Sequence, residues 1–153
     1  MHSNEAIAAR LGVLDLSTEV LGFIDYARQE LQAAGAVEAL DPAAFPLEHR
    51  FTPGAYTRTI LIRGPVLVAS RVHLTTHPFI ISRGEALVWS PEHGVQALMA
   101  HHVGITTPGT LRLLYVPVEV VWTTFHATTE TDPEKIKESF TANPLTYRLH
   151  DCR

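Results

Sequence analysis

The chain has 153 residues, of which 46% are hydrophobic and 18% are charged, and its formal net charge is −4. This length suits one domain with a full core, and the composition is too apolar for a disordered chain. The negative net charge gives no reason to expect nucleic acid or an anionic membrane as a partner. No apolar run reaches the length of about 18 residues that a transmembrane helix needs.

Two features of the chain ends favour a cytoplasmic protein. The single cysteine, Cys152, excludes an internal disulfide, which fits a reducing compartment. The stretch "MHSNEAIAARLG" lacks the basic start and apolar core of a secretion signal. We therefore expect the protein to work in the cytoplasm.

Residues 1–45 are predicted to form a helical extension and a linker. In "STEVLGFIDYARQELQAAGA", Ser17 suits the N-cap and Gly35 suits a stop, and a shorter helix is expected between Glu5 and Leu11. The longer helix carries an apolar stripe at helical spacing, made of Val20, Phe23, Ile24, Ala27 and Leu31. This stripe indicates a packing face, either against the rest of the domain or against a partner subunit in a homodimer.

Residues 46–130 are predicted to form a β-barrel. The connector "LDPAAFPLEHRFTPGA" is rich in proline, and short strand-like stretches with β-branched and aromatic residues begin at Tyr56. These stretches are "YTRTILIR", "VLVASRVH", "PFIIS", "EALVWS", "VQALMA", "LRLLYVP" and "VVWTTFH". Turn signals such as "RGP", "TTHP", "RG" and "PEHG" separate them, and no helix intervenes. Strands at this spacing indicate antiparallel sheets in a sandwich or barrel.

Residues 131–153 are predicted to form a short C-terminal helix and a tail. In "TDPEKIKESF", Asp132 suits the N-cap and Pro133 suits the first helical position. The fold class is therefore mostly β, with helices only near the two ends.

The stretch from Gly64 to Gly84, followed by "GITTPGTLRLLY", resembles the two motifs of the cupin superfamily. The first motif there has a His-x-His pair, a glutamate and a later glycine, and the second has a Pro-x-Gly turn before a histidine. The resemblance covers roughly residues 56–126 and implies a cupin-type jelly-roll barrel. The chain is also similar to a group of uncharacterised small single-domain cupins, some of them phage-encoded, and that likeness implies no known activity.

The cupin ligand positions are only partly kept. Counting back from Gly84, His77 stands where the family has its glutamate, and His73 stands at the second histidine. Arg71 replaces the first histidine, and no histidine lies near Arg112, where the second motif would place one.

His126 ends the last predicted strand, which a jelly roll would pair antiparallel with the strand that begins at His77. The prediction is a three-histidine site of His73, His77 and His126 for a divalent metal such as Zn, Fe, Ni or Mn. The alternative is that these histidines are polar residues at strand junctions, hydrogen-bonded to the backbone.

A ligand-binding role is predicted for four further residues. Arg71 and Arg112 could hold a carboxylate or a phosphate by bidentate hydrogen bonds if they face the cavity. Trp122 and Thr124 lie on the same face of their strand as His126, so they could line a cavity below the metal.

Other polar residues are expected at the surface or at strand ends, without a role in binding. A surface location is favoured for Tyr56 and Arg58, although both could reach the mouth of the cavity. His93 is expected in an exposed hairpin turn, and His101 and His102 at a strand end.

Two functions remain open from the sequence. One is a metal-dependent enzyme that acts on a small molecule with an anionic group, by oxygenation, isomerisation or hydrolysis. The other is a non-catalytic cupin that binds a small anionic ligand or serves as a structural homo-oligomer.

Overall fold

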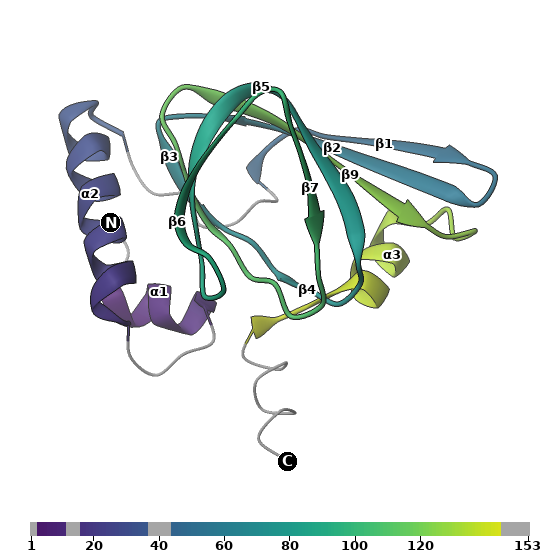
Figure 1. The fold of residues 1–153 in the computed structure, drawn as a ribbon, viewed down its shortest axis with the longest axis horizontal. Helices are drawn as coiled ribbons and strands as arrows, with labels where there is room; N and C mark the ends of the chain where they lie inside the picture. Colours follow the sequence, from purple (N-terminus) through teal and green to yellow (C-terminus); the bar gives the residue numbers. More distant parts are fainter. Residues whose placement is uncertain (1–2, 12–15, 37–43, 145–153) are drawn as a thin grey trace, which may run out of the picture.

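The computed structural model describes residues 3–11, 16–36 and 44–144, so Cys152 and the end of the predicted tail lie outside the described residues. The chain is a curled antiparallel sheet with helices only near its two ends (Figure 1). This confirms the predicted mostly-β class with N-terminal and C-terminal helices. Within the described ranges, no helix is long and apolar enough to cross a membrane.

The two N-terminal helices pack on the outside of the barrel. Helix α1 spans Asn4–Leu11 and helix α2 spans Thr18–Ala33, with the Ser17 hydroxyl accepting a hydrogen bond from the backbone N–H of Val20. The whole apolar stripe of α2 is buried. It packs against residues of the barrel that include Leu67, Ala69, Val72, Trp89, Leu111, Leu113 and Tyr115. The stripe is therefore covered by the domain itself, without a partner subunit.

The strands follow one another from residue 47 to residue 127. They are β1 (Leu47–Thr52), β2 (Ala55–Arg63), β3 (Val66–Ala69), β4 (Val72–His73), β5 (His77–Ser90), β6 (Gly94–Met99), β7 (His102–Thr106), β8 (Leu113–Val116) and β9 (Glu119–Ala127). The main sheet has eight strands in the order β1-β2-β9-β5-β8-β3, and β6 and β7 also pair with β5. The predicted antiparallel pairing of the last barrel strand with the strand that begins at His77 is confirmed.

Strand β5 corrects the prediction of two strands with a turn at Arg83–Gly84. It runs unbroken over 14 residues, and the register with β9 shifts between Ile81 and Arg83 instead. Gly84 follows the shift and pairs with Val120; it has a φ of +79°, and a Cβ there would sit 1.8 Å from the carbonyl oxygen of Glu119. The glycine thus allows β9 to approach closely just beyond a bulge in a continuous strand, and it does not mark a chain reversal.

Two strands lie in segments for which none was predicted. Strand β1 lies in the proline-rich connector and pairs with β2 across a tight turn, in which Gly54 has a φ of +78°. Strand β7 begins at His102 and pairs with residues 77–81 of β5. The predicted strand 66–73 is also interrupted, and it forms β3 and the short β4.

Helix α3 spans Pro133–Phe140 and is followed by the two-residue strand β10, Thr141–Ala142. The Asp132 carboxylate accepts a hydrogen bond of 3.0 Å from the backbone N–H of Glu134, which confirms the predicted N-cap. Strand β10 pairs antiparallel with β4, so Thr141 lies opposite His73. This small sheet holds the C-terminal helix over one end of the barrel (Figure 1).

Candidate functional site

The inward-facing residues of β2 and β9 form ordered levels along the barrel. Their register sets four pairs side by side: Tyr56 with His126, Arg58 with Thr124, Ile60 with Trp122, and Ile62 with Val120. The first two levels are polar and the last two are apolar. We call the end with Tyr56 and His126 the polar end, and the end with Ile62 and Val120 the apolar end.

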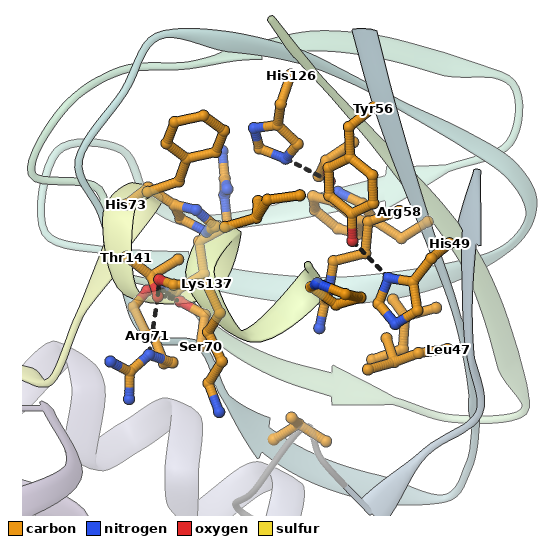
Figure 2. A pocket seen from close by; sticks show the side chains of 18 of the residues that line it. Leu47, His49, Tyr56, Arg58, Ser70, Arg71, His73, His126, Lys137 and Thr141 are labelled. Atoms are coloured by element: carbon orange, nitrogen blue, oxygen red, sulfur yellow. Dashed lines mark hydrogen bonds between the residues drawn. The ribbon is translucent and has the colours of Figure 1, made fainter. Parts of the chain in front are cut away.

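A cavity of about 270 Å³ lies between these strands, β3, β8 and helix α3. The polar lining from the strands and the loops between them comprises His49, Tyr56, Arg58, Ser70, Arg71, His73, Arg112, Thr124, His126 and Thr141. Helix α3 contributes Pro133, Glu134, Ile136, Lys137 and Phe140. Figure 2 shows these groups around one space, with His126 and Tyr56 on one side and Arg71 and Thr141 on another.

The three predicted metal ligands are neighbours. The ring centroid of His77 lies 5.2 Å from that of His73 and 4.3 Å from that of His126. The register explains this contact, because Phe79 of β5 pairs with Thr124 of β9, and His77 and His126 lie two residues further along. His73 comes from β4, where Thr141 is its partner.

Two ring nitrogens of this cluster are buried without a hydrogen-bond partner, namely Nε2 of His77 and Nδ1 of His126. Nδ1 of His77 lies 3.1 Å from the carbonyl oxygen of Thr75, so it carries the proton and donates it. Nε2 of His77 therefore keeps a free lone pair. Nε2 of His126 lies 2.9 Å from the Thr124 hydroxyl, which can either donate or accept.

All three imidazoles are neutral at physiological pH. Burial lowers the pKa of His73 to about 3, and the nearby charge of Arg112 acts in the same direction. Burial likewise lowers the pKa of His126 to about 4. The pKa of His77 is also lowered by burial, against the hydrogen bond to Thr75, which raises it. Neutral imidazoles are the form that binds metals.

The donor set fits a metal only in part. Free nitrogens of neutral rings are suitable ligands, but they do not converge as a set of three. Among residues 3–11, 16–36 and 44–144, no group of three or more His, Cys, Asp or Glu side chains is arranged to hold a metal ion. The three-histidine metal site therefore stays a prediction.

Arg112 faces the cavity, which is the condition under which the sequence predicts that it binds a carboxylate or a phosphate. Its Nη2 donates a hydrogen bond of 3.0 Å to the Thr106 hydroxyl. Its guanidinium carbon lies 5.0 Å from the ring centroid of Phe79 and 5.5 Å from that of Trp122. Burial lowers the pKa of Arg112 to about 10, an effect that the charge of Glu92 opposes, so the group stays protonated at neutral pH.

The other predicted ligand-binding residues also line the cavity. Arg71 donates a hydrogen bond of 2.9 Å from Nε to the Thr141 hydroxyl, and this bond ties it to the C-terminal strand. Trp122 stacks on Phe79, with ring centroids 4.6 Å apart. Thr124 is buried and holds His126 through the hydrogen bond described above.

Tyr56 and Arg58 correct the prediction of a surface location. Tyr56 is 2% exposed, and both residues line the cavity. The Tyr56 hydroxyl lies 2.5 Å from Nδ1 of His49, a residue that sequence reasoning left in the connector. Burial lowers the pKa of the Arg58 guanidinium and raises the pKa of Tyr56.

The alternation of β2 could have placed these residues, because Tyr56, Arg58 and Ile60 occupy every second position. This alternation indicates an inward face only if β2 has strand neighbours on both sides, and its neighbour β1 was not predicted. His93, by contrast, is exposed in the turn between β5 and β6, as predicted.

Neither Arg58 nor Arg112 forms an ion pair with a carboxylate in the part of the chain that the structure describes. The ion pairs between Arg50 and Glu48 and between Arg83 and Glu119 are at the surface, away from the cavity lining. The cavity is lined by four cationic side chains, those of Arg58, Arg71, Arg112 and Lys137, and by the carboxylate of Glu134, so its lining carries a net positive charge. The neutral rings of His73 and His126 also line it.

Comparison with known proteins gives a likeness to solved structures only. No protein-family model and no curated protein matches the chain. A protein with a double-stranded β-helix domain from Klebsiella pneumoniae is 18% identical, with a TM-score of 0.46, over 54% of this chain and 76% of that one. A cupin-2 domain protein from Shewanella frigidimarina is 12% identical, with a TM-score of 0.44, over 54% and 80% of the two chains.

An acetylacetone dioxygenase from Acinetobacter johnsonii is 18% identical, with a TM-score of 0.46, over 58% of this chain and 66% of that one. At these identities and scores the activities of the matched proteins do not transfer to this chain. The solved structures that it matches include cupin and double-stranded β-helix proteins, the family that the sequence resembles.

Proposed function

We propose that the chain binds a small organic anion in the barrel cavity, with Arg58 and Arg112 as its cationic contacts. One observation carries the proposal: both guanidinium groups line the cavity and neither has a carboxylate partner among the described residues. Both side chains are partly buried, and a charge that is partly withdrawn from water without a partner is unfavourable. A bound carboxylate would supply that partner.

The surroundings of Arg112 support this role. Its guanidinium is held by the Thr106 hydroxyl and by two aromatic rings, so its planar fork is oriented before a ligand arrives. Preorganised donors lose less entropy on binding, and a guanidinium matches a carboxylate with two parallel hydrogen bonds.

The first prediction tests the two arginines. Arg58→Gln and Arg112→Gln should each weaken binding of hexanoate or adipate by about 10- to 100-fold, because a hydrogen bond to a charged group contributes about 1.5–3 kcal/mol. Isothermal titration calorimetry measures the change. Arg50→Gln is the matched control, since Arg50 is exposed and paired with Glu48, and it should leave binding unchanged. Equal affinity for all four proteins would contradict the proposal.

A second candidate function is divalent-metal binding by His73, His77 and His126. The unpartnered nitrogens of His77 and His126 favour it, because a buried polar atom without a partner calls for an explanation. A bound metal would supply a Lewis acid at the polar end of the barrel. The charges of Arg58 and Arg112 oppose a cation there, and a bound anion would offset them.

The second prediction concerns this metal. Protein purified without a histidine tag should bind Zn²⁺ or Ni²⁺ with about one ion per chain, after a small rotation of the three rings. His77→Ala should remove most of the affinity, whereas His93→Ala, in an exposed turn, should remove none. Titration with metal analysis checks both. Binding that survives His77→Ala would place the ion elsewhere.

A further inference from the structure

We infer that the ligand is an amphipathic monoanion, with one carboxylate at the polar end of the barrel and an apolar body directed toward the apolar end. The inference rests on the proposed anion-binding function and assigns the chemical class of the ligand. It comes from how the cavity lining changes along the barrel axis.

The wall made by β2 and β9 changes from polar to apolar in one direction. Arg58 and Thr124 form one level, and Ile60 and Trp122 form the next level toward the Gly64–Pro65 turn. Ile62 lines the cavity one level further along. On this wall, a ligand that contacts Arg58 therefore has apolar side chains toward the Gly64–Pro65 turn and the polar pair Tyr56 and His126 on the other side.

The facing wall, made by β3 and β8, changes in the same direction. Arg112 donates its backbone N–H to the Ser70 hydroxyl at 2.9 Å, and these two residues form the polar level. Val68 pairs with Leu114 at the next level, and both line the cavity. Since β2 and β3 are joined by the turn at Gly64–Pro65, the apolar levels of the two walls lie at the same end.

The size of the cavity limits the ligand. A cavity of 150 Å³ can hold benzene, so 270 Å³ accommodates roughly ten non-hydrogen atoms. A carboxylate can accept hydrogen bonds from both guanidinium groups, because its two oxygens offer about four lone-pair sites. The remaining atoms would lie against Ile60, Ile62, Val68 and Leu114, whose side chains have no hydrogen-bonding groups.

A second charge on the ligand would lose more than it gains. Near the apolar levels a second carboxylate would give up its water without finding a donor, which is costly. A hydrophilic dianion such as phosphate would satisfy the arginines and leave the apolar half of the cavity without a contact. The lining therefore favours an aliphatic or aromatic monocarboxylate over either dianion.

The test compares acetate, butanoate, hexanoate, adipate and phosphate by calorimetry at one ionic strength. Affinity should rise by about fourfold for each methylene group from acetate to hexanoate, as expected from about 0.8 kcal/mol per buried methylene. Adipate, which places a second carboxylate at the far end of the same chain, should bind at least tenfold more weakly than hexanoate.

A near-isosteric variant locates the effect. Val68→Thr introduces a hydroxyl at the apolar level and should reduce the gain in affinity per methylene from acetate to hexanoate. Val103→Thr, at a position 68% exposed, should not change this gain. Circular dichroism confirms that each variant is folded.

The outcomes separate this inference from the proposed function. If adipate or phosphate binds as well as hexanoate, or chain length has no effect, the amphipathic ligand is excluded and the anion site stands. If none of the five anions binds, the anion-binding function itself is excluded.

Discussion

The neutral histidines of the polar end are a source of pH-dependent stability. In the unfolded chain a histidine has a pKa near 6.5, whereas burial lowers the pKa of His73 to about 3 and that of His126 to about 4. Below pH 6.5 the unfolded state therefore binds protons that the folded state does not. The stabilisation is fully present above pH 6.5 and is lost as the pH falls toward 4 and 3.

The third prediction follows from this difference. The melting temperature should fall as the pH is lowered from 7 to 5, before most carboxylates titrate, and it can be followed by circular dichroism. His73→Gln removes one of the responsible groups, so its melting temperature should depend less on pH. His93→Gln, in the exposed turn, should retain the full dependence. A melting temperature that is constant from pH 7 to 5 would refute the assignment.

The elements differ in how far the sequence could predict them. Helices α2 and α3 were predictable because Ser17, Gly35 and Asp132 are local signals whose partners lie within four residues. Strands β1 and β7 were not, because each is defined by pairing with a strand and not by a pattern of its own. The Arg83–Gly84 dipeptide is ambiguous in the same way, since a bulge and a turn both favour glycine.

The fourth prediction compares two glycines. Gly84→Ala should destabilise the protein by more than about 2 kcal/mol, because the new methyl group would overlap the Glu119 carbonyl and the positive φ disfavours alanine. Gly22→Ala lies inside α2 with nothing within 4 Å, so it should stabilise by about 0.5–1 kcal/mol. Urea denaturation measures both, and a similar effect at the two sites would show that β5 is not constrained at Gly84.

At the scale of the molecule, the cavity is lined by residues from seven strands and one helix. The predicted histidines and Arg112 were found through the family motif and the expected pairing of two strands. Arg58 and His49 were missed because their inward positions depend on the pairing of β1 with β2 and of β2 with β9. Residues that meet only through long-range pairing leave no local signal, and the convergence of three ring nitrogens depends on rotamers that a sequence pattern does not encode.

The fifth prediction concerns assembly. The α2 stripe is buried on the barrel, so Ile24→Ala, at a fully buried position, should destabilise the chain by about 2–5 kcal/mol without changing its oligomeric state. Val103→Ala, largely exposed, should cost less than about 0.5 kcal/mol.

We propose that the protein is a homodimer, with a mass by light scattering of twice 16.9 kDa. If Ile24→Ala is still folded but no longer dimeric, the dimer interface would lie on α2, contrary to this expectation.

The position of β9 between β2 and β5 has a consequence for how the chain folds. The strand that joins these two is the last of the barrel in sequence, and it pairs with partners that precede it by roughly 40 to 70 residues. Because contacts of such long sequence separation slow folding, we expect the barrel to form on the millisecond-to-second timescale rather than in microseconds. During synthesis, β2 and β5 leave the ribosome without the strand that separates them. The sheet can therefore close only after residue 127 has been translated.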